Sequence, residues 1–285
     1  MINLLPVLNN IAFGVSSYRY SVSHTKDPTL QNDLHYETHG FTACEFPKPE
    51  IELIKKASSR IIPIISGDYN LNCQPWGINR SKDQTSLVRI SQPHLCDSLL
   101  KSLICDSSLG RIVAKTTNSK SVRVWGTQLY YKGNATSQTS VVGWHRDAEH
   151  MPYFKKGSIT AWLPFIDTNE ENGTIHYIKG SHKWKSHFVH TGAQIQHWAK
   201  QNQSLREQAI KSQNSWGITP LHLKIGQFSL HHCKTLHGSS PNYSNTARPA
   251  LAIGLLLDDY EIDDSVPDYG FANALNDPSI SPIIY

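Results

Sequence analysis

The chain has 285 residues, of which 39% are hydrophobic and 18% are charged, a composition that allows a sizeable core and argues against wholesale disorder. No low-complexity linker divides the sequence, so a single domain over residues 1–285 is expected. The formal net charge of +4 is spread along the chain without a basic stripe, and we therefore expect no nucleic-acid partner.

The first third of the chain predicts helices. Residues 1–34 show little periodicity and are expected to pack as an arm over the domain or to fray. Between residues 47 and 64 apolar side chains recur at helical spacing, which predicts a helix that supports a sheet. Residues 67–92 are polar and are expected to form a loop. Helical spacing returns at 93–114.

From residue 122 onward the sequence consists of short apolar runs bounded by Gly, Asn and Pro, a pattern typical of strands. The predicted strands are 122–131, 139–144, 158–166, 174–178, 227–232 and 250–257. Many short strands behind early helices favour a mainly β fold with flanking helices, a double-sheet jelly roll, over a parallel α/β sheet. The pair Asn172-Gly173 predicts a hairpin.

A polar segment with helical spacing, residues 194–211, interrupts these strands within an insertion of about 192–222. Its place between two strands is compatible with a lid over the substrate and equally with an exterior helix that has no catalytic role, and the sequence leaves both open. The acidic segment 258–264 is expected to be solvated rather than to form a site.

The cysteines indicate a reducing environment. Cys44, Cys73, Cys96, Cys105 and Cys233 are widely spaced and contain no C-x-x-C pair, which is typical of free thiols. The apolar run within residues 1–13 has no basic segment before it, so we expect neither a signal peptide nor a membrane span. A cytoplasmic location is the resulting expectation.

A histidine and an aspartate two residues apart, His145 and Asp147, are the most informative feature of the sequence. At a strand end, residues i and i+2 lie on the same side of the backbone, and a distant histidine, His237, can complete one face of a metal. Two imidazoles and a carboxylate hold non-haem Fe(II) on one side of its octahedron and leave positions for a co-substrate and O₂. We therefore predict His145, Asp147 and His237 as metal ligands and catalytic residues.

Arg248 supplies the charge that such a site still needs. A planar guanidinium binds the far end of a dicarboxylate with two parallel hydrogen bonds. A buried arginine is costly without an anion. The alternative is an internal salt bridge between Arg248 and an aspartate.

Four stretches of the sequence resemble the phytanoyl-CoA dioxygenase family of Fe(II)/2-oxoglutarate oxygenases. They are Gly143-Trp-His-Arg-Asp147, Trp162-Leu-Pro-Phe-Ile-Asp167, Gly180-Ser-His182 and His237-Gly-Ser-Ser-Pro-Asn242. The resemblance covers about residues 36–257. It implies a cupin-like double-stranded β-helix with Fe(II) at its open end and with 2-oxoglutarate and O₂ as co-substrates.

The resemblance also implies roles for single residues. Arg248 lies at a separation from His237 similar to that of the arginine that pairs with the C5 carboxylate of 2-oxoglutarate. Trp162 and Ser239 look like positions that contact the co-substrate, and Gln128 is a further candidate. The remaining histidines are interpreted differently: His231 and His232 lack the Gly-Ser-Ser-Pro run behind them and are expected to be core residues or supports of the site, and His150, His176 and His182 are expected to be structural.

The implied reaction is hydroxylation of an unactivated C–H bond of a small molecule, with release of succinate and CO₂. In related halogenases a small residue takes the acid position, whereas Asp147 fills it here, so halogenation is not expected. Desaturation, cyclisation and a non-catalytic metal-binding jelly roll remain alternatives, although the last leaves Arg248 unexplained. The oligomeric state is left open.

The substrate is not identified by the sequence. We expect a polar or secondary metabolite, of which tailoring of a cylindrospermopsin-type alkaloid is one instance. Five side chains are expected to line a polar mouth: Trp76, Arg80, Arg89, His150 and Tyr153.

Overall fold

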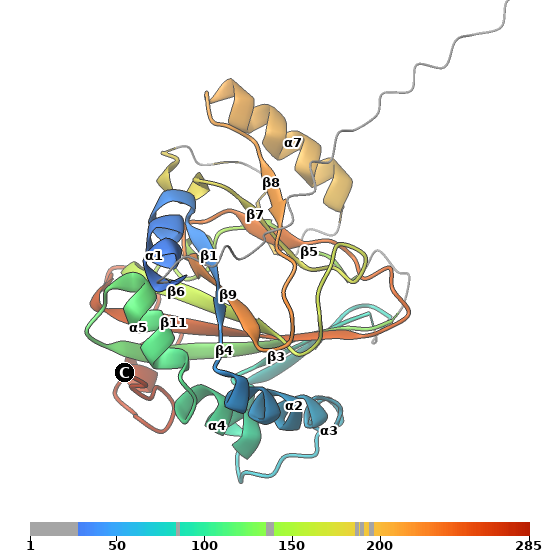
Figure 1. Cartoon of the computed structure of the whole chain (residues 1–285), viewed down its shortest axis with the longest axis vertical. Helices are drawn as coiled ribbons and strands as arrows, with labels where there is room; N and C mark the ends of the chain where they lie inside the picture. The colour runs from blue at the N-terminus through green and yellow to red at the C-terminus, as the bar shows by residue number, and fades with distance from the viewer. Residues whose placement is uncertain (1–27, 84–85, 135–139, 186–187, 189–190, 194–196) are drawn as a thin grey trace, which may run out of the picture.

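Two antiparallel sheets form the centre of the computed structural model (Figure 1), which describes residues 28–83, 86–134, 140–185, 188, 191–193 and 197–285. The larger sheet contains β1 (Phe41–Glu45), β2 (Gly77–Arg80), β3 (Leu87–Ser91), β4 (Val122–Lys132), β6 (Phe154–Pro164), β9 (Gln227–His232) and β11 (Arg248–Ile262). The smaller contains β5 (Val142–His145), β7 (Ile175–Ile178), β8 (Ile218–Pro220) and β10 (His237–Ser239). The strand orders are β1-β9-β6-β11-β4-β3-β2 and β5-β10-β7-β8.

Helices cover the outer face of the larger sheet. Below the sheet in Figure 1 lie α2 (Ile51–Ser59), α3 (Ile61–Ile65) and α4 (Ser98–Cys105), and beside it lie α1 (Pro28–His39) and α5 (Leu109–Thr117). Single turns of 3₁₀ helix, η1 (Lys48–Glu50) and η2 (Pro93–Leu95), precede α2 and α4. The main hydrophobic core fills the space between these helices and the sheet.

Strand alternation separates this core from the interior between the sheets. On β11 the side chains of Leu251, Ile253 and Leu255 belong to the helix-side core, whereas Ala250 belongs to the cluster between the sheets. Because successive strand residues point to opposite faces, Arg248 lies on the same inner face as Ala250. One strand thereby supplies both a packed core and an arginine to the interior.

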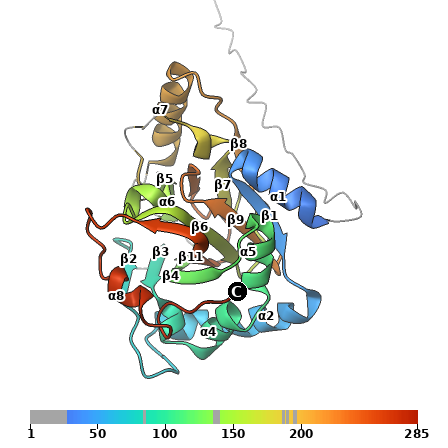
Figure 2. The ribbon, with the colours of Figure 1, turned by 90° about the vertical axis from the view of Figure 1, so that its left-hand side faces the viewer.

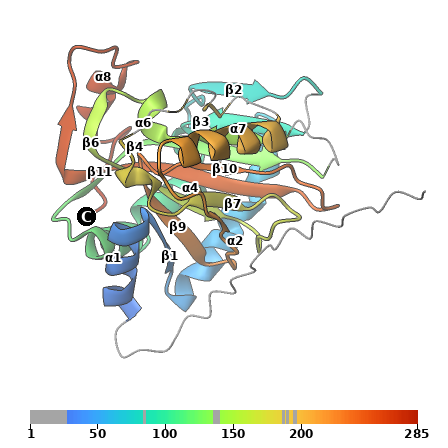
Figure 3. The same ribbon diagram turned by 90° about the horizontal axis from the view of Figure 1, so that it is seen from above.

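The outer face of the smaller sheet is covered by α7 (Trp198–Lys211), which lies over β10 and β7 when the molecule is seen from above (Figure 3). Leu205 and Ala209 of α7 pack in a cluster with Trp144 and Ile178. The indoles of Trp144 and Trp198 stack with their ring centroids 4.9 Å apart. This helix therefore lies on the side of the smaller sheet that faces away from the interior.

Two short helices lie at the ends of strands. The first, α6 (Asp147–His150), follows β5 directly, and the second, α8 (Phe271–Leu275), lies on the same side of the molecule as β2 and β3 (Figure 2). The C-terminal residues return to β4, since the Val122 amide donates to the Tyr285 carbonyl oxygen at 2.9 Å. Within the described residues, no helix combines the length and apolarity that a membrane crossing requires.

The fold class is as predicted, and most predicted elements are present with changed bounds. The region 47–64 is divided at Arg60 into α2 and α3, and the region 93–114 into η2, α4 and α5. The loop predicted at 67–92 is wrong, because it contains β2 and β3. Both are short, and β2 is an edge strand with exposed side chains, so neither gives a long apolar run.

The hairpin predicted at Asn172-Gly173 is also wrong. The strands on either side of it, β6 and β7, belong to different sheets and do not pair. Gly173 has a φ of +73° and packs against the backbone of Ser240 and Pro241, where a Cβ would collide. The turn therefore carries the chain from one sheet to the other.

The predicted arm and tail contain regular structure. Residues 28–34 of the arm lie in α1, and residues 1–27 lie outside the described part. Residues 258–262 of the acidic segment continue β11, although their side chains are largely exposed as expected. The predicted strand 139–144 is observed as β5, and its first residue falls outside the described residues.

Candidate metal and co-substrate site

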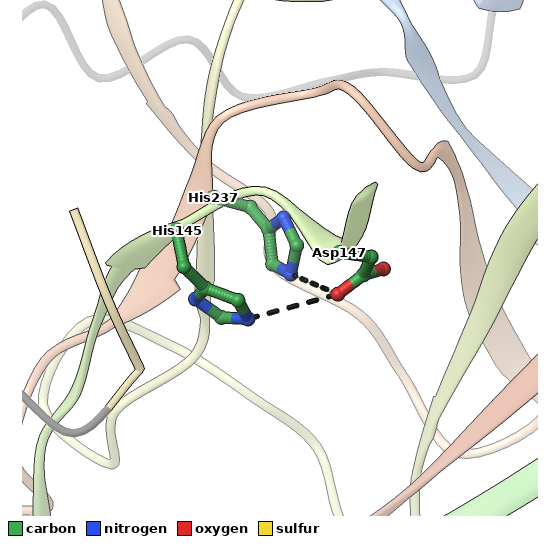
Figure 4. A group of neighbouring side chains, drawn as sticks. All are labelled: His145, Asp147 and His237. Carbon is green, nitrogen blue, oxygen red and sulfur yellow. Dashed lines mark ion pairs between the residues drawn. The ribbon is translucent and has the colours of Figure 1, made fainter. Parts of the chain in front are cut away.

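Two paired strands of the smaller sheet bring the histidines of the predicted triad together. His145 at the end of β5 is the register partner of His237 at the start of β10, so their rings share a face and lie 4.2 Å apart between centroids. Asp147 begins α6 immediately after β5. One of its oxygens, Oδ1, is 3.7 Å from His145 Nε2 and 3.5 Å from His237 Nε2 (Figure 4).

The tautomers of the two histidines suit metal binding. His145 Nδ1 lies 2.8 Å from the Gly143 carbonyl oxygen and His237 Nδ1 lies 2.9 Å from that of Thr235, so each Nδ1–H donates to backbone and each Nε2 keeps its lone pair. Burial lowers the pKa of His145 and, more strongly, of His237. The three ligand atoms lie within 4.8 Å of one another, which fits one metal ion.

The second oxygen of Asp147 is fixed by two other side chains. Thr160 Oγ1 donates to Asp147 Oδ2 at 2.7 Å, and His231 Nε2 lies 3.2 Å from the same oxygen. The hydroxyl oxygen of Tyr177 in turn lies 2.9 Å from His231 Nδ1. Burial tends to raise the pKa of Asp147, but His237, His231 and His145 outweigh it and keep that pKa below its usual range. The carboxylate is thus charged and oriented with Oδ1 toward the imidazoles.

Arg248 lies in the same cavity as the triad, and we call this space the inner cavity. Its lining includes His145, Asp147, His237, Trp162, Ser239 and Arg248. Arg248 is 1% exposed, and its Nε and Nη1 atoms have no hydrogen-bond partner. No carboxylate among the described residues forms an ion pair with it, so the predicted alternative of an internal salt bridge is not observed. Burial lowers its pKa to about 9, which leaves the guanidinium charged at pH 7 and in need of an anion.

The weaker candidates divide between two spaces. The Arg248 guanidinium lies 5.3 Å from the ring centroid of Trp162, and Trp162 and Ser239 line the inner cavity. Gln128 lines instead the larger space next to it, which we call the outer cavity, and lies 3.4 Å from Ser91 Oγ. Gln128 is not among the residues that line the inner cavity with Arg248, and its role as a co-substrate contact stays a prediction.

Sequence reasoning missed several residues that support the site. Thr160 precedes Trp162 by two positions on β6, so strand alternation was the available signal for its inward face. Lys132 is fully buried beside Arg248, its register partner on β4, and donates to the carbonyl oxygens of Ser239, at 3.2 Å, and Ser240. Burial and the Arg248 charge lower the pKa of Lys132 well below its usual value. The sequence feature that could have identified Lys132 is its position at the end of an apolar strand.

Of the other histidines, His231 lies beside the triad, with its ring centroid 4.3 Å from that of His237, whereas His176, His182 and His232 make their contacts elsewhere. His231 supports Asp147, as expected for a residue near the site, and His232 Nδ1 accepts from the Lys234 backbone amide. His176 packs on the outer face beside Trp198, and His182 Nε2 reaches the Glu37 carbonyl oxygen. His150 is closer, with its ring centroid 5.4 Å from that of His145.

The predicted mouth is observed in part. Trp76, Arg89 and His150 line the outer cavity. Arg80 does not, because its guanidinium donates to the Ile65 carbonyl oxygen, and Tyr153 is buried in a separate cluster. Of the insertion 192–222, Ala193 lines the outer cavity, whereas α7 covers the opposite face of the smaller sheet. The lid stays a prediction, and residues 194–196 lie outside the described part.

Comparison of the sequence with protein families finds one match, to the model of the phytanoyl-CoA dioxygenase (PhyH) family over residues 74–250. A curated relative from Stutzerimonas stutzeri, a probable alpha-ketoglutarate-dependent hypophosphite dioxygenase, is 27% identical over 190 residues. The aligned part is 66% of this chain and 61% of that protein, so the chain spans less than two thirds of the curated relative's length.

Solved structures share the fold. The alpha-ketoglutarate-dependent carbocyclase SnoK from nogalamycin biosynthesis superposes with a TM-score of 0.64 at 16% identity, covering 90% of this chain and 96% of SnoK. EctD from S. alaskensis, solved with 2-oxoglutarate and 5-hydroxyectoine, gives a TM-score of 0.63 at 18% identity and covers 82% of this chain and 77% of EctD. The predicted double-stranded β-helix is thereby confirmed.

Proposed function

The chain belongs to the phytanoyl-CoA dioxygenase family of Fe(II)- and 2-oxoglutarate-dependent oxygenases, and from this premise we propose that it hydroxylates an unactivated C–H bond of a small organic molecule. The products are the alcohol, succinate and CO₂. One observation carries the proposal: two Nε2 lone pairs and a carboxylate oxygen converge in a cavity whose far wall holds an arginine with unpartnered donors. A dicarboxylate co-substrate would accept hydrogen bonds from the donors of that arginine and balance its charge.

Each residue has a definite part in this proposal. His145, His237 and Asp147 Oδ1 hold Fe(II), and Arg248 binds the distal carboxylate of 2-oxoglutarate with Trp162 against its guanidinium. Ser239 lies in the same cavity as a further co-substrate contact. When bound, the iron and 2-oxoglutarate supply the oxidising power. The chain orients both, places the substrate and excludes water.

Asp147 favours oxygen insertion over halogenation. Its Oδ1 is directed toward both histidines, and Thr160 and His231 hold Oδ2, so the carboxylate occupies the metal position that a halide would need. The available positions are then those of 2-oxoglutarate and O₂. A non-catalytic metal site is the alternative, and the unpartnered donors of Arg248 argue against it because such a site needs no dicarboxylate.

The test is the product mass after reaction with Fe(II), 2-oxoglutarate and ¹⁸O₂ in excess chloride, over a panel of metabolites. We expect substrate-dependent succinate and a product heavier by one labelled oxygen atom. A product lacking two hydrogens indicates desaturation or cyclisation instead, and a chlorinated product contradicts the proposal. Absence of succinate with every substrate, together with stable metal binding, supports the non-catalytic alternative. A cytoplasmic location and a role in natural-product biosynthesis belong to the same proposal.

A further inference from the structure

The outer cavity lies directly in front of the metal ligands. It measures about 510 Å³, and His145, Asp147, Tyr130 and Thr160 line both this cavity and the inner one. Cavities of roughly 300–1,000 Å³ accommodate drug-sized molecules. A molecule in the outer cavity therefore has room for a ring system and still touches the metal position.

One wall of the outer cavity is aromatic. The ring centroid of Phe271 in α8 lies 5.2 Å from that of Trp125 on β4 and 5.7 Å from that of Trp76. Gly254 on the neighbouring strand allows the Trp125 indole to lie close, because a Cβ at that position would overlap the indole ring. The three rings are tilted to one another, and together they form an apolar wall that can contact a ring by its face or its edge.

Two residues that line the outer cavity carry a buried donor without a partner. Gln92 accepts the Thr127 amide N–H with its side-chain oxygen at 2.8 Å, which fixes the orientation of its amide, and its Nε2 has no partner. The indole Nε1 of Trp125 is likewise buried without a partner. Both atoms are buried behind the surface of the cavity, so the polar contacts of a ligand fall to the other lining residues.

The charge of the outer cavity favours an anion. Arg89 on β3, the register partner of Tyr130 on β4, contributes a guanidinium to the lining. Among the described lining residues Asp147 is the sole carboxylate, and the metal takes its charge in the proposed function. Arg89 is the one arginine or lysine among the described residues that line the outer cavity, and an anionic substituent on the substrate can share its guanidinium with the contacts that Arg89 already makes.

We propose that the outer cavity binds an organic anion, in which a planar ring packs against Trp76, Trp125 and Phe271 while an acidic oxygen group lies toward Arg89. This inference rests on the proposed function and names the substrate class for it. It separates the protein from a reaction on a small inorganic oxoanion such as hypophosphite. Such an ion leaves the aromatic wall uncovered and most of the 510 Å³ unfilled.

Binding of simple probes tests the inference without knowledge of the natural substrate. Calorimetric titration of the protein loaded with Mn(II) and 2-oxoglutarate, without O₂, compares naphthalene-2-sulfonate with neutral 2-naphthol, cationic 2-naphthylmethylammonium, sulfate and hypophosphite. We expect naphthalene-2-sulfonate to bind about tenfold or more tightly than each of the others, because it alone combines the ring and the negative charge.

Two kinds of variant distinguish the contribution of the aromatic wall to probe binding from the contribution of the Arg89 charge. Arg89→Gln should weaken naphthalene-2-sulfonate by about tenfold and leave 2-naphthol unchanged. Trp76→Ala and Phe271→Ala should weaken both ring probes by about two- to tenfold. Matched controls are Arg206→Gln on the exposed side of α7 and Tyr243→Ala, where the side chain is 50% exposed. Neither residue lines the outer cavity, and both controls should bind all probes like the unmodified protein.

The outcomes distinguish this inference from the function on which it rests. If Mn(II) and 2-oxoglutarate do not bind, the proposed function fails, and titration of the metal-free protein still reports on the cavity. If both bind but hypophosphite or the cationic probe binds most tightly, the substrate class is overturned and the function stands. Equal loss of sulfonate binding in Arg89→Gln and in Arg206→Gln also overturns the inference.

Discussion

The inner and outer cavities share His145 and Asp147, but they differ in how much of their lining comes from the margin of the larger sheet. The inner cavity takes its lining from paired strands of both sheets, among them β6, β10 and β11, whose register fixes each side chain. The outer cavity takes Trp76 from the residue before the edge strand β2, Arg89 from β3 and Phe271 from α8 near the C-terminus. Peripheral elements tolerate change more easily than a double-sheet interior. The proposed metal and co-substrate residues therefore lie on or next to paired strands, whereas three residues of the proposed substrate site, Trp76, Arg89 and Phe271, lie toward the margin of the larger sheet.

The largest expected effect is loss of the metal on changing an inner ligand. His237→Ala should abolish succinate formation and bound Fe(II), because its Nε2 is one of the three converging ligand atoms. The metal-to-protein ratio and a succinate assay measure both. His176→Ala, on the outer face of the neighbouring strand, is the matched control and should retain metal. Near-normal succinate with iron in His237→Ala would point to His231 as the ligand.

Removal of the Arg248 guanidinium should lower the affinity for 2-oxoglutarate without preventing metal binding. Arg248→Ala removes the donors that face 2-oxoglutarate, and charge-assisted hydrogen bonds are worth about 1.5–3 kcal/mol, so co-substrate affinity should fall by roughly ten- to a hundredfold or more. Anaerobic titration with Fe(II) bound measures this. Arg206→Ala on α7 should show the affinity of the unmodified protein, and an unchanged affinity in Arg248→Ala removes the arginine from the site.

Lowering the pH should reduce the free energy of unfolding through His94, a buried histidine that contacts the outer cavity's lining residue Thr127. His94 lies under the wall of this cavity, with Nδ1 2.8 Å from Thr127 Oγ1 and Nε2 3.1 Å from the Ile280 carbonyl oxygen, and burial lowers its pKa to about 4. Because this folded pKa lies below the 6.5 of an exposed histidine, the unfolded chain takes up a proton first as the pH falls below 6.5. The stability contributed by the neutral ring is lost between pH 6.5 and 4, by about 2 kcal/mol at pH 5.

Urea unfolding of His94→Asn at pH 7 and pH 5 measures that contribution. The loss of unfolding free energy on acidification should be smaller than in the unmodified protein by about 2 kcal/mol. Ile62→Asn, at an exposed position without a titratable group, is the control and should leave the pH dependence unchanged. Equal pH dependence in His94→Asn and the unmodified protein would contradict the assignment.

The smallest effect concerns the orientation of Asp147. Thr160→Val keeps the shape of the side chain but removes the hydroxyl that donates to Asp147 Oδ2, and loss of such a support typically weakens metal affinity by about tenfold or somewhat more. Competition with a chelator gives the affinity. Thr42→Val, a buried threonine of β1 outside both cavities, should bind metal normally. An unchanged affinity in Thr160→Val would mean that His231 alone holds the carboxylate.

The sequence predicted the inner cavity much better than the outer one. The spacing of His145 and Asp147 on one strand end is a local signal, and Arg248 follows His237 within one short segment, so a linear pattern contains most of the site. Thr160 was missed because a threonine in an apolar strand has several explanations. Trp125, Gln92 and Phe271 were missed because no local pattern joins residues so far apart in the chain.

The long strands were predicted, whereas several of the shortest elements were missed. The strands β4 and β6, of 11 residues each, were found. The three-residue β10 was not, although it carries His237, because its hydrogen bonds to β5 and β7 define it rather than its composition. Arg80 and Tyr153 were misplaced for a related reason: a polar or aromatic residue near the site in sequence can point away from it.

Strand β5, which ends at His145, is an edge strand, and its free edge is covered. Trp144, next to His145, donates its amide to Gln201 Oε1 at 2.8 Å and accepts from Gln201 Nε2 at 2.9 Å, so one side-chain amide acts as a missing strand neighbour. Gly192 also donates to the Trp144 carbonyl oxygen. Unpaired edges are templates for aggregation. Gln201 of α7 thereby satisfies both backbone hydrogen-bonding groups of Trp144 next to His145, a structural role for the helix that is independent of the substrate.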